Sequence, residues 1–114
     1  MTTMNENLDQ VLLVITSCPD KATAIAIAEM LLVKRLAACV NVMPEVMSLY
    51  MWNGKQERSH EVLLQIKTTS DAYPALQACI TENHPYEVPE IIALPVVAGL
   101  PAYLQWAHDQ TGRQ

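Results

Sequence analysis

An Asn-Gly pair at positions 53 and 54 constrains the fold of this chain more than any other feature of the sequence. Asn-Gly favours the tight type I′ turn that joins two antiparallel strands, because both residues accept a positive φ. Residues 56–68, after the pair, alternate between two faces as a half-buried strand does, and residues 46–52, before it, form a second strand pattern. The sequence therefore predicts a long β-hairpin, around which the other elements must be arranged.

The other elements follow from apolar patterns and from the residues that interrupt them. A continuous branched run at residues 11–16 is typical of a central strand that is buried on both faces. One helix is predicted from residue 21, with Asp20 as its N-cap, to about residue 36. A second helix is predicted from about residue 71 until the His84-Pro85 pair ends it. Further strands are expected at residues 37–43 and 91–97, and a short final helix at residues 101–107.

Local patterns also indicate which surfaces are buried. Each long helix presents an apolar stripe that we assign to the core. The stripe of the first helix comprises Ala24, Ile27, Ala28 and Leu31, and that of the second comprises Tyr73, Leu76, Cys79 and Ile80. Pro44 separates residues 37–43 from the hairpin strand, which is expected only at a sheet edge or at a bulge.

The order of these elements predicts the fold class. Strand, helix, two strands, helix and strand form an α+β, ferredoxin-like βαββαβ antiparallel sheet with two helices on one face, followed by a C-terminal helix. The apolar side chains of Leu63, Met47, Leu49 and Met51 then exceed what two helices cover, so a closed homo-oligomer is expected. We expect one domain over residues 10–112 and a flexible tail over residues 1–9.

Composition excludes several classes of protein. The chain has 12 carboxylates against 7 Lys and Arg and no basic run, which argues against a nucleic-acid surface. No apolar stretch reaches membrane-spanning length and no signal peptide is visible, so a cytoplasmic protein without a membrane partner is expected. The three cysteines show no metal-binding spacing and are expected to be free thiols, with Cys39 and Cys79 buried in the core.

The predicted topology gathers Cys18, His84 and the carboxylates of Glu87 and Glu90 at one end of the sheet. Cys18 would lie beside a helix N-terminus, whose dipole lowers the pKa of a thiol, and a thiolate with an imidazole suits copper. The alternative interpretation is that Cys18 fills a strand-to-helix corner and that His84 is an ordinary residue at a helix C-terminus. No nucleophile–base pair is evident, so no enzyme activity is expected.

The hairpin supplies a second group of candidate site residues. Tyr50 and Trp52 share one strand face, and Lys67 lies near the far end of the partner strand. An aromatic pair at this spacing is also usual in a core or an interface. If the chain binds a small molecule in a cleft, the candidate lining residues are Tyr50, Trp52, Lys67, Tyr86, Glu87 and Glu90.

Five segments, in order, together resemble the CutA family of divalent-cation tolerance proteins. They are Thr-Ser-Cys-Pro-Asp at 16–20, Leu-Ala-Ala-Cys-Val-Asn at 36–41, Ser-Leu-Tyr-Met-Trp-Asn-Gly-Lys at 48–55, Ile-Lys-Thr at 66–68 and His-Pro-Tyr-Glu-Val-Pro-Glu at 84–90. The resemblance covers residues 11–106, which is nearly the whole predicted domain.

The resemblance implies a cytoplasmic, ferredoxin-like subunit in a homotrimer like that of the PII signalling proteins, with a role in tolerance of copper and other divalent metal ions. Copper binding in some members is ascribed to a cysteine near the end of the first strand and to histidines before the Pro-Tyr pair. Here Thr16 holds the strand-end position and the cysteine is Cys18, while Asn83 leaves His84 as the one imidazole.

Three functional hypotheses follow. The first is a trimeric metal-responsive protein that binds copper weakly, with His84 and Cys18 as candidate ligands. The second is a PII-like small-molecule sensor that uses clefts between subunits. The third is a trimeric scaffold with no ligand of its own.

Overall fold

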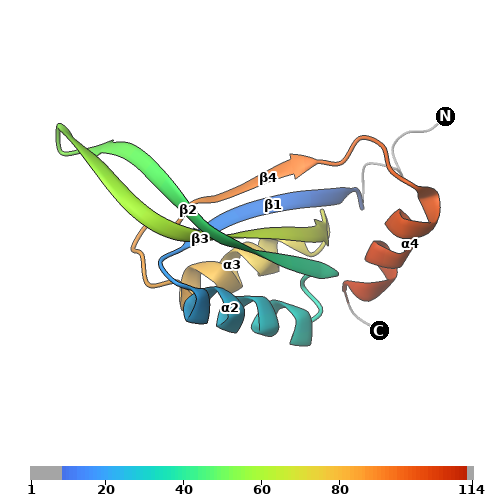
Figure 1. Ribbon diagram of the computed structural model, residues 1–114. Coiled ribbons are helices and arrows are strands. Elements are labelled where there is room, and N and C mark those ends of the chain that lie inside the picture. Colours follow the sequence, from blue (N-terminus) through green and yellow to red (C-terminus); the bar gives the residue numbers. More distant parts are fainter. Residues whose placement is uncertain (1–8, 113–114) are drawn as a thin grey trace.

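The Asn53-Gly54 turn forms as the sequence predicts. Both residues have a positive φ, 50° and 80°, and they join β2 (Cys39–Trp52) to β3 (Lys55–Thr69) in antiparallel register with Trp52 opposite Lys55. The computed structural model describes residues 9–112, and the hairpin is its longest feature, projecting beyond the rest of the sheet (Figure 1). Most of the predicted tail, residues 1–8, lies outside the described residues.

Two more strands complete the sheet. β1 (Val11–Cys18) pairs with β3 on one side and with β4 (Ile91–Pro95) on the other, and every pair is antiparallel. The strand order is β2-β3-β1-β4, which is the ferredoxin-like order that the sequence predicts. The strands β2 and β4 therefore form the two open edges.

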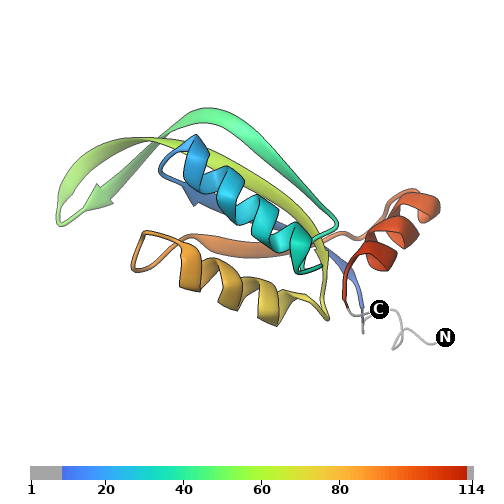
Figure 2. The ribbon, with the colours of Figure 1, turned by 90° about the horizontal axis from the view of Figure 1, so that it is seen from below.

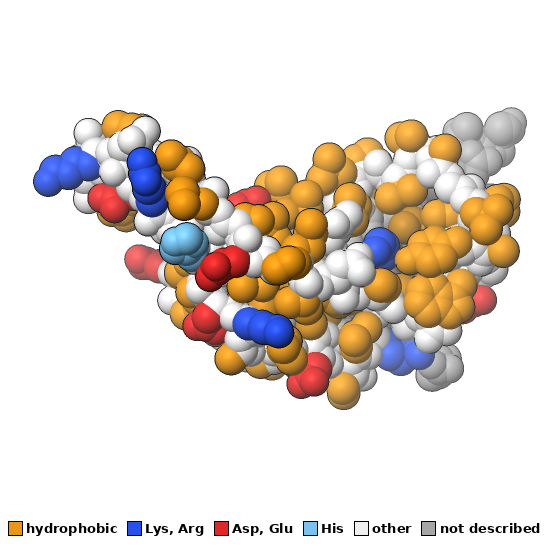
Figure 3. All heavy atoms as spheres, in the orientation of Figure 1, with side chains coloured by type: hydrophobic (Ala, Val, Ile, Leu, Met, Phe, Trp, Pro, Cys, Tyr) orange, Lys and Arg blue, Asp and Glu red, His pale blue; other side chains and the backbone are white. Residues whose placement is uncertain are grey.

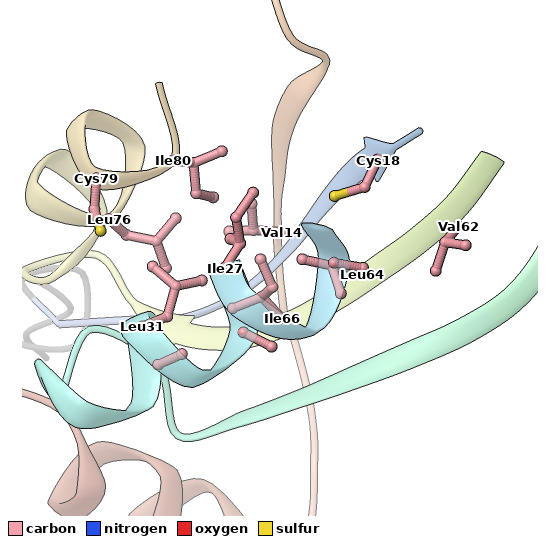
Figure 4. Packing of buried hydrophobic residues seen from close by; sticks show 13 residues of the cluster. Val14, Cys18, Ile27, Leu31, Val62, Leu64, Ile66, Leu76, Cys79 and Ile80 are labelled. Carbon is pink, nitrogen blue, oxygen red and sulfur yellow. The ribbon is translucent and has the colours of Figure 1, made fainter. Parts of the chain in front are cut away.

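Two helices, α2 (Lys21–Val33) and α3 (Tyr73–Asn83), cover one face of the sheet (Figure 2). Figure 4 shows their apolar side chains packed against Val14, Leu64 and Ile66 of the strands. The predicted stripe of α2 is confirmed in full, and in α3 Leu76, Cys79 and Ile80 are buried while Tyr73 is partly buried. A third helix, α4 (Pro101–Gln110), packs against Val11 and Ala38 at the end of the sheet farthest from the hairpin turn.

Helix α2 ends earlier than predicted, and the backbone of Arg35 is the reason. Arg35 has a φ of 59°, in the left-handed region that glycine usually occupies after a helix. The N–H of Leu36 bonds to the carbonyl of Leu31 and the N–H of Arg35 to that of Leu32, the pair of bonds that closes a helix C-terminus. The guanidinium of Arg35 also donates to the carbonyls of Gly112 and Asp109, which fastens this turn to the end of α4.

Pro44 does not end a strand. The pairing between β2 and β3 shifts between Met43 and Val46, so the proline lies in a bulge of the edge strand β2, as expected for a residue without an N–H.

The prediction that the first strand is a central strand buried on both faces is confirmed in its central position and only in part in its burial, since Val11 and Ser17 at its ends are buried on the helix-free face. Val14, Thr16 and Cys18 face the helices and are fully buried, whereas Leu13 and Ile15 point to the other face and are half-buried. Of the helices in residues 9–112, none covers the middle of that face (Figure 1). Cys39, opposite Lys67 on the same face, is likewise half-buried, which corrects the expectation that it is a core residue.

Large apolar side chains are exposed on the hairpin and along β4. They include Met47, Leu49 and Met51 of β2 and Ile92 and Leu94 of β4. Figure 3 shows hydrophobic side chains spread over the hairpin, the sheet edge and α4. Among the described residues, no helix is long and apolar enough to cross a membrane.

The two adjacent leucines of α2 provide a test of this packing. Leu31 is 0% exposed and Leu32 is 44% exposed. Leu31→Ala should lower the free energy of unfolding by about 2–5 kcal/mol because it opens a cavity between helix and sheet. Leu32→Ala should cost about 0.5 kcal/mol or less. Denaturant unfolding at one fixed protein concentration measures both, and equal losses would contradict the described core.

Candidate functional site

A cleft of about 740 Å³ lies on the sheet face without helices. It is bounded by the hairpin and by the segment between α3 and β4, residues 84–90, which we call the connector. We call it the connector cleft. Its lining residues are Ser17, Tyr50, Trp52, Glu57, Glu61, Tyr86, Glu87, Val88 and Glu90.

Strand alternation places the hairpin residues of this cleft on one face. Tyr50 lies opposite Glu57 in the ladder, and Val46 lies opposite Glu61, so side chains at these positions point to the same side. The Tyr50 hydroxyl forms a hydrogen bond of 2.7 Å with the hydroxyl of Ser59. Tyr86, Glu87, Val88 and Glu90 of the connector supply the opposite wall.

The imidazole of His84 holds the connector against the end of β1. Its Nδ1 accepts the backbone N–H of Tyr86 at 3.1 Å, so Nε2 carries the proton and donates to the carbonyl of Ser17 at 2.7 Å. His84 is only 8% exposed, and its ring lies 4.8 Å from that of Tyr86, centroid to centroid. Both ring nitrogens are therefore used within the fold.

Tyr86 and Ser48 both donate to one buried carboxylate. The Tyr86 hydroxyl reaches Oε2 of Glu61 at 3.1 Å, and the Ser48 hydroxyl reaches Oε1 at 2.7 Å. Glu61 is 8% exposed, and none of the ion pairs formed within residues 9–112 involves it. The described hydrogen-bond donors of the Glu61 carboxylate are thus both neutral, and a buried carboxylate without a cationic partner is costly.

The phenol of Tyr86 stays protonated at neutral pH. Burial, followed by its hydrogen bond to Glu61 and the charge of that carboxylate, raises the pKa of Tyr86 from 10.0 to about 12. The hydroxyl therefore remains a donor to Glu61. On the other side of the cleft, the hydroxyl of Ser17 reaches Glu90 at 3.5 Å.

Cys18 is not the reactive thiol that its position suggested. It is 0% exposed in the core (Figure 4), and burial, with smaller contributions from Asp20 and Glu61, raises its pKa from 9.0 to about 11. The expected lowering of this pKa by the helix dipole is wrong. The Asp20 carboxylate caps the helix through the N–H of Thr23 at 2.8 Å and opposes the dipole. Cys18 fills the strand-to-helix corner as a neutral thiol.

The side chains around His84 do not form a preorganised metal centre. Within residues 9–112, no three His, Cys, Asp or Glu side chains converge as metal ligands do. Cys18 is a protonated core thiol and His84 has no free nitrogen in this fold. The donor set of one protomer thus does not fit a tight copper centre, and ligation by Cys18 and His84 stays a prediction.

The structure brings together most of the residues selected from the sequence. Five of the six predicted lining residues surround the connector cleft: Tyr50, Trp52, Tyr86, Glu87 and Glu90. Lys67 lies on the same sheet face but near the other end of β3, where its ammonium group donates to Asn41. Sequence reasoning missed Glu61 and Glu57, although the alternation of β3 already placed both on this face.

Comparison with known proteins identifies close relatives. Residues 12–110 match the family model of the CutA1 divalent ion tolerance protein. The chain is similar to Protein CutA of Mus musculus, with 50% identity over 95 residues that make up 83% of this chain and 54% of the relative. It is also similar to the divalent-cation tolerance protein CutA of Thermus thermophilus, with 43% identity over 99 residues, 87% of this chain and 96% of the relative.

The fold agrees with these matches. The crystal structure of CutA1 from Oryza sativa superposes with a TM-score of 0.89 at 37% identity, covering 92% of this chain and 96% of that one. The chain spans about half the length of the mouse and human relatives it matches, at 54% and 53%.

The raised pKa of Cys18 makes a pH-dependent prediction. Between pH 9 and pH 11 the unfolded chain loses the Cys18 proton while the folded chain keeps it, so this thiol lowers stability as pH rises through that range. The stability of the wild type relative to Cys18→Ala should therefore fall by on the order of 1 kcal/mol from pH 8 to pH 10. Denaturant unfolding at the two pH values measures the difference, with Leu32→Ala, which removes no titratable group, as the control. A constant difference would contradict the assignment.

Proposed function

This chain belongs to the CutA1 family of divalent ion tolerance proteins, and we propose that it acts in tolerance of divalent metal ions as a cytoplasmic homotrimer that binds these ions weakly through the carboxylates of the connector cleft. The observation that carries the proposal is Glu61, a buried carboxylate whose described partners are two neutral hydroxyls.

The surroundings of Glu61 favour cations. Glu57, Glu87 and Glu90 line the same cleft, and the chain carries a formal net charge of −5. A concave site lined by charges of one sign raises the local concentration of counter-ions. A hard divalent cation that keeps several waters needs only one or two carboxylates, so weak binding requires no convergent three-residue centre.

Copper is the metal that the family resemblance implies, and the proposal assigns it to carboxylates. Cu²⁺ stands at the top of the affinity order for divalent ions at nitrogen and oxygen sites, so it should bind these oxygens more tightly than Mn²⁺ does. Cys18 and His84 are weaker candidates as ligands, because the thiol is buried and protonated and the imidazole is engaged on both nitrogens.

The assignment of a trimer rests on the open edges of the sheet and their apolar side chains. β2 and β4 each present an unpaired row of backbone groups, and Ile92 and Leu94 expose large side chains on β4. Joining edge β2 of one copy to edge β4 of the next is a head-to-tail contact, and such contacts close into a ring when the rotation allows.

Sedimentation velocity at micromolar concentration checks the oligomeric state. We expect one species with three times the 12.7 kDa mass of the chain. Ile92→Lys should shift this species toward monomer, because it places a charge on an edge that the ring buries. Val33→Lys, at an exposed position of α2, should not. A stable wild-type monomer would exclude the trimer.

Calorimetric titration with Mn²⁺ and Cu²⁺ at low ionic strength checks the metal proposal. Glu61→Gln and Glu90→Gln should each weaken binding by about threefold or more, because each removes one charge beside the ion. Glu82→Gln, a matched change on the exposed surface of α3, and Cys18→Ala should leave binding unchanged.

X-ray absorption at the copper edge supplies an independent readout of the ligands. An oxygen-only ligand shell is expected. Sulfur or imidazole scattering would contradict the carboxylate assignment and identify Cys18 or His84 as a copper ligand. If no divalent ion binds, the proposal of metal binding fails and the scaffold hypothesis is favoured.

A further inference from the structure

We propose that the connector cleft is a site for an organic cation that carries two or more ammonium groups on an aliphatic chain, such as a diamine or polyamine. This inference rests on the proposed function in one respect, namely that the cleft selects cations. It adds a ligand class that the binding of a hydrated metal ion does not require.

The aromatic wall of the cleft is the first argument. Trp52, Tyr50 and Tyr86 all line it, and Trp52 is 64% exposed at the hairpin end of the wall. A hydrated metal ion gains little from such rings because its waters separate it from them. An alkylammonium group is weakly shielded and is attracted to the face of an indole or phenol ring. Three rings beside carboxylates therefore favour an organic cation.

The carboxylates supply the second argument. Each oxygen of Glu61 accepts one hydroxyl, from Ser48 and Tyr86, and a carboxylate has about four lone-pair positions, so both oxygens can still accept a donor. An ammonium group has three donors and would give this buried charge a cationic partner. Glu57, Glu87 and Glu90 offer further positions for a second ammonium group.

The volume of the cleft and the sign of the charges that line it limit which ligands can bind. The cleft volume of about 740 Å³ is far larger than one metal ion needs and lies within the range of about 300–1,000 Å³ that is typical of small-molecule sites. Val88 adds apolar surface to the lining, which suits a methylene chain. Of the described residues that line the cleft, none is Lys or Arg, so phosphates and carboxylates are unsuitable ligands.

The test compares probes of equal length and different charge at constant low ionic strength. The probes are 1,4-diaminobutane, butylamine and 1,4-butanediol, titrated by calorimetry into the full chain, with Mn²⁺ as the metal probe. We expect the diamine to bind at least about fivefold more tightly than the monoamine, since a second ion pair forms, and the diol not to bind.

Variants separate the aromatic contribution from the electrostatic one. Trp52→Leu should weaken diamine binding by about threefold or more and leave Mn²⁺ binding unchanged, because only the organic cation uses the ring. Trp52→Phe should retain most of the affinity. Trp106→Leu, at an exposed tryptophan of α4, is the matched control and should change neither. Glu61→Gln should weaken the binding of both the diamine and Mn²⁺.

The possible outcomes separate the two proposals. Saturable Mn²⁺ binding without diamine binding overturns the organic-cation site and leaves the metal proposal intact. Diamine binding without binding of any divalent metal ion overturns the metal proposal alone. Diamine affinity that is unchanged in Trp52→Leu, or equal to that of butylamine, also overturns the inference.

Discussion

The two hydrogen bonds of the His84 imidazole are the constraint on which the candidate site depends. One fixes the local turn between His84 and the backbone of Tyr86, and the other joins this connector to the carbonyl of Ser17 at the end of β1, 67 residues earlier in the chain. With the connector fixed in this way, the Tyr86 hydroxyl reaches Glu61 on the hairpin strand β3. The His84 side chain thus positions both the connector wall of the cleft and the Tyr86 hydroxyl that bonds to the buried carboxylate of Glu61.

The same hydrogen bonds change the role assigned to the residues that resemble metal ligands. The imidazole has both nitrogens engaged, and the Cys18 thiol is buried and protonated, so neither side chain offers an accessible ligand atom to an ion in this fold. The groups that are free to meet a cation are the carboxylates on the opposite sheet face. Charge, rather than the presence of Cys and His, therefore determines where ligand binding is expected in this chain.

Local signals in the sequence predicted most of the fold, because short-range chemistry specifies it. The Asn53-Gly54 turn, the Asp20 cap and the buried stripe of α2 follow from backbone preference and periodicity. The burial of Glu61 could not be predicted in this way, because its two partners come from β2 and from the connector. The pKa of Cys18 was predicted in the wrong direction, because burial outweighed the helix dipole.

The protonation of His84 tests the central claim of this account most directly. Nitrogen-15 NMR of the histidine side chains in the full chain at pH 7 distinguishes the two neutral tautomers and the charged form. We expect a proton on Nε2 of His84 and an unprotonated Nδ1. Both should stay the same when a diamagnetic divalent ion, Zn²⁺, which does not broaden the signals as Mn²⁺ would, is added at saturating concentration. A proton on Nδ1, or a metal-induced change at either nitrogen, would contradict the role of His84 as the internal link that builds the cleft.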